Sequence, residues 1–121
     1  MKKNKTIGIV GQGFVGGALR EGMSHAFTVE TYDKFVLEKS TCESLYDLVL
    51  KTEVIFLCLP TPMRKDGSCD LRIVETVVGD IDNFCVSNNL CKILVVKSTI
   101  PPGTTSGLNN TVKNVQVVFN P

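Results

Sequence analysis

Hydrophobic residues gather in five short runs along the chain, and each run has the length and composition of a β-strand. The third run, from residue 53 to residue 59, is almost continuously apolar, which is typical of a central strand covered by helices on both faces. The other runs cover residues 6–10, 27–32, 93–96 and 115–119. These runs predict a parallel sheet.

Between the strands, apolar residues recur at intervals of three and four positions, which predicts helical connections. The helical segments lie within residues 14–25, 34–52, 70–84 and 104–112. Strands that alternate with helices indicate an α/β fold. We therefore expect a Rossmann-type, doubly wound parallel sheet of about five strands in the order 3-2-1-4-5. The chain ends on the fifth strand, so we expect that strand to leave an unprotected edge.

The turn between the first strand and the first helix carries the pattern Gly-x-Gly-x-x-Gly from residue 11 to residue 16. In this context the first glycine permits a tight turn, the second lets the backbone approach a pyrophosphate, and the third lets the helix pack closely on the sheet. Such a pattern alone also arises by chance, so the prediction depends on the strand before it and the helix after it. The predicted cofactor contacts in this turn are Gly11, Gly13, Phe14, Val15 and Gly16.

An acidic residue follows at the distance that a dinucleotide site requires. Asp33 lies about 20 residues after Gly13, at the end of the second strand. Its carboxylate can accept hydrogen bonds from the adenosine ribose hydroxyls of NAD and would repel a 2′-phosphate. Two like charges about 4 Å apart near a surface cost on the order of 4 kcal/mol. The expected cofactor is therefore NAD. Lys34 is also expected to contact the cofactor, and its positive charge could partly neutralise Asp33 and weaken the preference for NAD over NADP.

Composition limits the class of protein and its partners. The 121 residues carry a net charge of +1, so no basic excess points to nucleic acid. No apolar run approaches the roughly 20 residues needed to cross a bilayer, so we expect no membrane partner and a cytoplasmic location. Five cysteines without a two-residue spacing argue against a disulfide framework and a zinc site, which predicts free thiols and no metal. This length suits one domain, so residues 1–121 are predicted to form one dinucleotide-binding (Rossmann-like) domain.

Proline and hydroxyl residues crowd the ends of the third and fourth strands. Residues 60–62 read Pro-Thr-Pro, and residues 97–104 read Lys-Ser-Thr-Ile-Pro-Pro-Gly-Thr. In open α/β sheets, ligands bind at the carboxyl ends of the strands. The alternative is that Ser98 and Thr99 only cap and turn the chain.

Together these stretches resemble the N-terminal, NAD-binding domain of the UDP-glucose/GDP-mannose dehydrogenase family, oxidoreductases that oxidise a nucleotide sugar twice to the uronic acid. The resembling segments are residues 11–16, 56–62, 97–104 and 120–121. The resemblance implies that Pro60 and Thr61 contact the cofactor. It also implies that Thr99 lies beside the nicotinamide and the reacting sugar carbon, as a cofactor-binding and catalytic residue. A hydroxyl can donate and accept hydrogen bonds there without holding charge.

The resemblance covers the whole chain but only the first part of a family enzyme. The family's thiol nucleophile and substrate-binding residues lie later, and none of the five cysteines here has that context. We therefore expect a fragment or one half of a larger enzyme, inactive alone, which meets a nucleotide-sugar substrate only when a second domain or chain completes the site. The alternative is a stand-alone NAD-binding module for sensing or regulation; Thr61 and Thr99 favour the enzyme. Homo-oligomerisation remains open.

Overall fold

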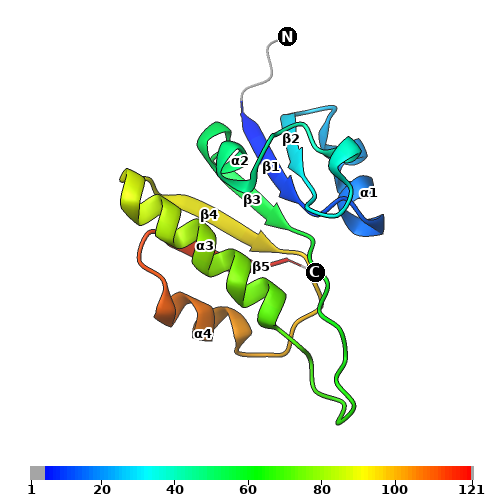
Figure 1. Ribbon diagram of the computed structural model, residues 1–121, viewed down its shortest axis with the longest axis vertical. Helices are drawn as coiled ribbons and strands as arrows, with labels where there is room; N and C mark the ends of the chain where they lie inside the picture. The colour runs from blue at the N-terminus through cyan, green and yellow to red at the C-terminus, as the bar shows by residue number, and fades with distance from the viewer. Residues whose placement is uncertain (1–4, 121) are drawn as a thin grey trace.

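The computed structural model describes residues 5–120, and five strands in this range form one parallel sheet (Figure 1). The strands are β1 (Thr6–Val10), β2 (Thr28–Tyr32), β3 (Val54–Leu57), β4 (Lys92–Val96) and β5 (Val115–Phe119). The helices are α1 (Phe14–Met23), α2 (Leu45–Lys51), α3 (Arg72–Asn88) and α4 (Thr104–Thr111), with a 3-10 turn η1 (Leu37–Lys39) before α2. The predicted fold class is confirmed.

The expected strand order is wrong, because the sheet runs β2-β1-β3-β4-β5 and β1 pairs with both β2 and β3. The residues explain the difference. Ile55 and Leu57 of β3 are completely buried, whereas Thr28 of β2 is exposed. An apolar strand gains most from an interior position, and a strand with polar residues tolerates the edge. Thr41 pairs with the outer edge of β2, since Thr31 N donates to Thr41 Oγ1 (2.8 Å) and Thr41 N donates to Thr31 O (2.9 Å).

The main core lies on one face of the sheet. Helices α2, α3 and α4 pack there through buried residues such as Leu48, Val78 and Leu108, against strand residues that include Leu57 and Val96. Helix α1 packs against β1 and β2 and adds no residue to this cluster as far as residues 5–120 are concerned. This arrangement leaves the N-terminus of α1 beside the carboxyl ends of β1 and β2.

The outer edge of β5 is covered by side chains, contrary to the expectation of an unprotected edge. Asn109 of α4 acts as a strand partner: its Nδ2 donates to Val117 O (2.8 Å) and its Oδ1 accepts from Val117 N (2.9 Å). Asp82 of α3 accepts a hydrogen bond from Val115 N (3.2 Å). Because these groups are satisfied, little of the edge remains free to pair with another strand.

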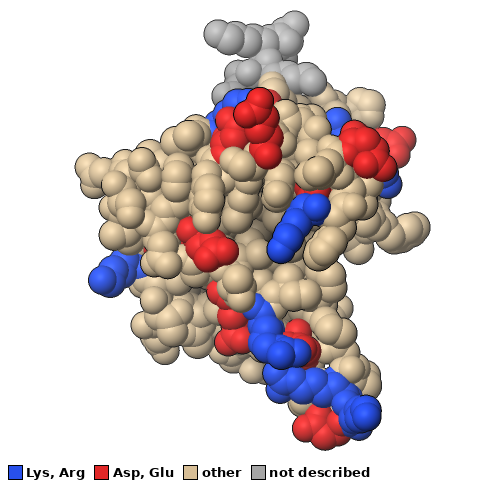
Figure 2. All heavy atoms as spheres, viewed as in Figure 1, with Lys and Arg blue, Asp and Glu red and all other residues tan. Residues whose placement is uncertain are grey.

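The link between β3 and α3 projects from the body as a narrow loop (Figure 1), closed by an antiparallel bridge between Met63 and Cys69. Figure 2 shows positive and negative side chains side by side on this loop. Asp70 lies 2.7 Å from Arg72 Nη2 and 3.6 Å from Arg64 Nη2. The Arg72 guanidinium holds the pKa of Asp70 well below its usual range. The loop therefore presents paired charges.

Within residues 5–120, no helix has the length and hydrophobicity to cross a bilayer.

Candidate dinucleotide-binding site

A cavity of about 880 Å³ opens at the carboxyl ends of β1, β2 and β3. Eight of the ten residues predicted to bind the cofactor line it. They are Gly11, Gly13, Phe14, Val15, Gly16, Asp33, Lys34 and Pro60. The two others, Thr61 and Thr99, lie outside this lining. The structure therefore brings the glycine turn and the acidic residue to one cavity, as the sequence predicts.

The glycine turn is held by close backbone contacts. Gly11 has a φ of +98°, and its N–H donates to Tyr32 O (2.8 Å). A β-carbon at Gly11 would collide with Cys58 O, and one at Gly16 would collide with Gly11 O. Both positions therefore require glycine, the first for its conformation and the second because the helix lies against the turn. The steric demands expected of the motif are met at these two positions.

The N-terminus of α1 is open toward an anion. Gly13 is the N-cap residue, no side chain caps the helix, and the first turn contains no acidic residue. The first helical hydrogen bond runs from Gly17 N to Gly13 O (2.9 Å), so the N–H groups ahead of Gly17 have no partner inside the helix. A β-carbon at Gly13 would meet nothing within 4 Å, so the backbone is accessible there. Free N–H groups and the positive end of the helix dipole suit a phosphate.

Asp33 is held in one orientation at the other end of the turn. It is 9% exposed; its Oδ2 accepts from Gln12 N (2.7 Å) and its Oδ1 from Phe35 N (2.8 Å) and Val36 N (3.2 Å). Burial works to raise the pKa of Asp33, but these N–H groups and the charge of Lys39 outweigh it and leave the pKa below its ordinary value. The carboxylate is therefore ionised at neutral pH and oriented before any ligand arrives.

Lys34 lies too far from Asp33 to form an ion pair with it. Its ammonium group lies over the ring of Phe35, 5.8 Å from the ring centroid. Phe35 itself is 83% exposed at the cavity wall. The basic residue next to Asp33 is thus directed at an aromatic ring, and Asp33 lines the cavity without an ion pair to Lys34.

The ends of β3 and β4 are joined by hydroxyl groups. Ser98 Oγ accepts from Leu59 N (3.0 Å) and donates to Leu59 O (2.6 Å), while Thr61 Oγ1 donates to Thr99 O (2.9 Å). Cys69 Sγ lies within donor range of Thr61 O (3.6 Å) and Thr99 O (3.8 Å). The two segments that the sequence singled out therefore meet in space. Ser98 has a structural role here, in line with the alternative interpretation, and the side chain of Thr99 is exposed.

Sequence reasoning missed several groups at this site. Lys97 lines it next to Ser98, and Gln12 donates its backbone N–H to Asp33. One side of α3 also lines the cavity, through Arg72, Ile73, Thr76, Val77 and Asp80. The spacing of this last set over two helical turns is the signal that could have identified it, because residues four apart share a helix face.

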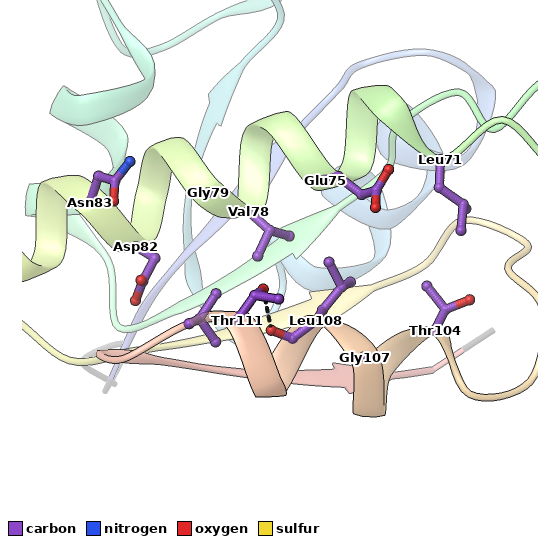
Figure 3. Close-up of a pocket in the computed structure, with 11 residues that line it drawn as sticks. Leu71, Glu75, Val78, Gly79, Asp82, Asn83, Thr104, Gly107, Leu108 and Thr111 are labelled. Atoms are coloured by element: carbon purple, nitrogen blue, oxygen red, sulfur yellow. Dashed lines mark hydrogen bonds between the residues drawn. The ribbon is translucent and has the colours of Figure 1, made fainter.

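A second cavity, about 370 Å³, lies between α3 and α4 (Figure 3). Gly79 and Gly107 widen it, since a β-carbon at either would meet nothing within 4 Å. Its buried carboxylate belongs to Asp82, which already accepts hydrogen bonds from Lys113 N (3.1 Å) and Asn114 N (2.7 Å). The cavity's buried carboxylate is thus already engaged by backbone N–H groups, and Glu75 is the other acidic residue in its lining.

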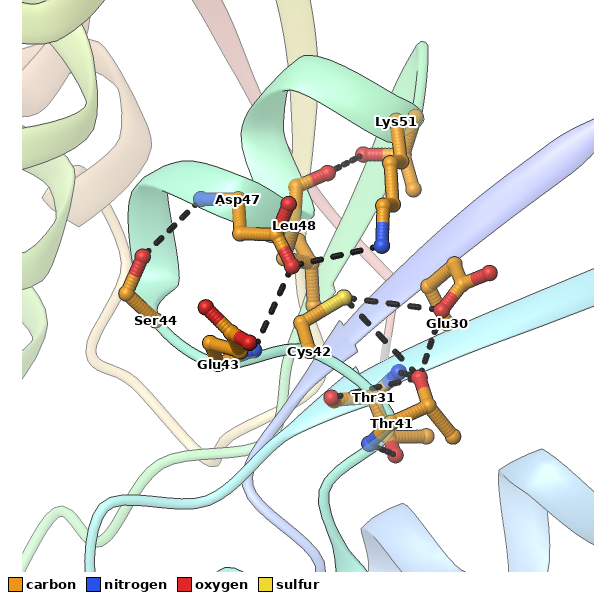
Figure 4. Close-up of polar contacts among 10 residues, drawn as sticks. Glu30, Thr31, Thr41, Cys42, Glu43, Ser44, Asp47, Leu48 and Lys51 are labelled. Atoms are coloured by element: carbon orange, nitrogen blue, oxygen red, sulfur yellow. Dashed lines mark hydrogen bonds and ion pairs between the residues drawn. The ribbon is translucent and has the colours of Figure 1, made fainter.

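The cysteines are all free. In the polar cluster of Figure 4, Cys42 Sγ donates to Glu30 Oε1 (3.5 Å), and Thr41 Oγ1 donates to the same oxygen (2.6 Å). Burial raises the pKa of the Cys42 thiol to about 11. Burial also raises the pKa of Cys58 to about 11, although the charge of Lys97 acts in the opposite direction. The part of the chain that the structure describes contains no group of His, Cys, Asp and Glu side chains suited to a metal.

Known proteins share this architecture. The sequence profile of the UDP-glucose/GDP-mannose dehydrogenase family, NAD binding domain, matches residues 30–121. An uncharacterized protein of Methanocaldococcus jannaschii is 38% identical over 90 residues, 73% of this chain and 10% of that protein. The UDP-glucose 6-dehydrogenase AglM of Haloferax volcanii is 32% identical over 76 residues, 63% of this chain and 18% of the enzyme. A solved UDP-glucose dehydrogenase from Pyrobaculum islandicum matches with a TM-score of 0.85 and 27% identity, over 97% of this chain and 35% of that one.

The chain thus spans about a third of the solved dehydrogenase and less than a fifth of the two sequence relatives. Of the segments that carried the resemblance, Pro121 lies outside the described residues. The profile match begins within β2, and the structural match covers nearly the whole chain. The cofactor of the domain is NAD. The chain therefore belongs to the UDP-glucose/GDP-mannose dehydrogenase family and contains its NAD-binding domain.

Proposed function

We propose that this chain is the cofactor half of a nucleotide-sugar 6-dehydrogenase and that the cavity beside α1 holds the NAD. The observation that carries the proposal is the pairing, in one cavity, of an uncapped helix N-terminus with a buried, ionised Asp33. The backbone at Gly11, Gly13, Phe14, Val15 and Gly16 would bind the pyrophosphate. NAD would supply the hydride acceptor for oxidation of the sugar alcohol.

In this proposal Asp33 selects NAD over NADP. Its Oδ1 and Oδ2 already accept three backbone hydrogen bonds, yet each carboxylate oxygen can accept more than one, so capacity remains for the ribose hydroxyls. A 2′-phosphate would meet the carboxylate at short range in a partly buried site, where like charges repel strongly. Lys34 contacts the cofactor from the rim and, directed at Phe35, neutralises Asp33 only weakly.

At the opposite end we propose that Pro60, Thr61 and Thr99 contact the nicotinamide half of NAD, with Thr99 the catalytic residue. The hydrogen bond from Thr61 Oγ1 to Thr99 O fixes the backbone of Thr99 (2.9 Å). The hydroxyl of Thr99 then stands exposed at the carboxyl end of β4. There it could hold a substrate oxygen by donating or accepting a hydrogen bond without carrying charge.

A substrate-binding half, on the same or another polypeptide, would complete the enzyme. The chain covers 35% of the solved UDP-glucose dehydrogenase. The family resemblance places the thiol of the second oxidation in a later segment of the enzyme, so we assign that role to none of the five cysteines here. Alignment of substrate with cofactor contributes roughly 7–11 kcal/mol to lowering a barrier, and the 121 residues alone lack a second half to provide it. The alternative of a sensing module draws no support from the relatives, several of which carry the name of a UDP-glucose dehydrogenase.

Calorimetry of the purified chain with NAD and NADP tests the proposal. We expect NAD to bind more tightly than NADP, and we expect Asp33→Ala to reduce the difference between the two affinities. Equal affinities for NAD and NADP in the unmodified chain would remove Asp33 from the ribose site. With UDP-glucose or GDP-mannose added, the 121 residues alone should form no NADH. NAD-dependent absorbance growth that Thr99→Ala abolishes would mean that they hold a complete active site.

A further inference from the structure

The side chain of Gln12 is buried behind the glycine turn. It is 2% exposed, and its Nε2 lies 3.1 Å from Gly11 O and 3.4 Å from Gly16 O, donating to both. Its backbone N–H donates to Asp33 Oδ2 (2.7 Å). One residue therefore connects the start of the turn, the first turn of α1 and the acidic residue of the ribose end.

We infer that Gln12 is a positioning residue that sets the phosphate-binding turn and the ribose-binding carboxylate in their joint geometry. It is absent from the residues that line the cavity, whereas its neighbours Gly11 and Gly13 line it. Gln12 therefore acts through the turn and does not touch the ligand. The inference rests on the proposed function, because it assumes that NAD occupies this cavity.

The turn needs such support for a physical reason. Its two flanking residues are glycines, which lose more conformational freedom on ordering than any other residue. The carbonyl of Gly11 lies so close to Gly16 that a β-carbon there would collide with it, so that oxygen is packed against the helix. The amide of Gln12 gives it a hydrogen bond in this crowded position. Without that donor, the orientation of the peptide after Gly11 is set less firmly, and that peptide carries the N–H that holds Asp33.

Two substitutions of similar size separate this role from others. Gln12→Met keeps the volume but removes the donor. Gln12→Glu keeps the volume and places an acceptor opposite two carbonyl oxygens. Gln116, which is exposed on β5, offers matched controls as Gln116→Met and Gln116→Glu. A third variant, Gly13→Val, tests whether NAD binds in the proposed cavity.

We expect Gln12→Met to bind NAD roughly tenfold more weakly than the unmodified chain, the effect of losing about one to two net hydrogen bonds. Gln12→Glu should bind poorly at pH 8 and recover as the pH falls toward 5. Burial and two facing carbonyls raise the pKa of the introduced carboxyl, and its protonated form can again donate one hydrogen bond. Neither the unmodified chain nor the Gln116 variants should follow this pH profile.

Calorimetry at several pH values, with circular dichroism to verify folding, tests the inference. A Gln12→Glu variant that is folded and whose NAD affinity follows the pH profile of the unmodified chain would overturn it, as would unweakened binding by Gln12→Met. If Gln12 only stabilised the fold, its variants would have lower melting temperatures, but the NAD affinity of Gln12→Glu would not recover as the pH falls. If Gly13→Val binds NAD normally, the proposed cavity fails instead, so the two failures are distinguishable. Should Gln12→Met not fold, the pH series on Gln12→Glu still separates the two outcomes.

Discussion

Replacing Gly13 by valine should abolish tight NAD binding and leave the fold intact. Gly13 has a φ of −73°, which any L-residue can adopt, and a β-carbon there would meet no atom within 4 Å. The added β-carbon would therefore contact no other atom of the free protein. It would occupy the open space in front of the first turn of α1, where the proposed function places the pyrophosphate.

The expected magnitudes differ between folding and binding. Valine is a poorer N-cap residue than glycine, so the free energy of unfolding should fall by about 1 kcal/mol at most. A hydrogen bond from a backbone N–H to a charged phosphate contributes about 1.5–3 kcal/mol. Loss of one such bond weakens binding by roughly 10- to 100-fold, and loss of two makes binding undetectable at ordinary concentrations.

Gly17→Val is the matched control, because a β-carbon at Gly17 also meets nothing within 4 Å and valine tolerates a helix interior about as well as glycine. Isothermal titration with NAD and thermal unfolding would be measured on both variants and the unmodified chain. We expect similar melting temperatures throughout and a loss of affinity in Gly13→Val only. Normal binding by Gly13→Val, or equal losses in both variants, would refute the assignment of the turn to the pyrophosphate.

Three further predictions concern stability, association and thiol chemistry. The pKa of Asp33 is lower in the folded chain than its ordinary value of 3.8, so the stability that its carboxylate contributes is complete above pH 3.8 and is lost as the pH falls through the lowered pKa. Urea unfolding from pH 7 to pH 2 should show this loss of stability, and the loss should be smaller in Asp33→Asn. Asn109→Ala should free the edge of β5 and produce concentration-dependent association in sedimentation, whereas a monomeric variant would mean that the edge is protected otherwise. Maleimide at pH 8 should label exposed Cys91 and spare Cys42, whose thiol is buried with a pKa of about 11; mass spectrometry that finds Cys42 labelled in the folded chain would contradict this.

Several features were already determined by local sequence. Strands β3 and β4 were predictable because four to six apolar residues in a row require a buried strand or helix, and the shortness of these runs favours a strand. The glycines at positions 11 and 16 were predictable because a tight turn requires a positive φ at the first and the helix packs against Gly11 O at the second. Asp33 could be found because the distance from turn to acid is set by one helix and one strand. Each of these depends on neighbours along the chain.

Other features were decided only by the tertiary structure. The order of β3 relative to β1 depends on the path of the connection after β2, and the local pattern said only that β3 is buried. The pairing of Thr61 with Thr99 joins residues at the ends of two strands, and the covering of β5 by Asn109 depends on where α4 lands. Gln12 occupies a variable position of the glycine motif, and only the folded chain places its amide between two carbonyls. Hydrogen bonds of this kind form between groups that tertiary packing brings together, so the periodicity of the sequence does not predict them.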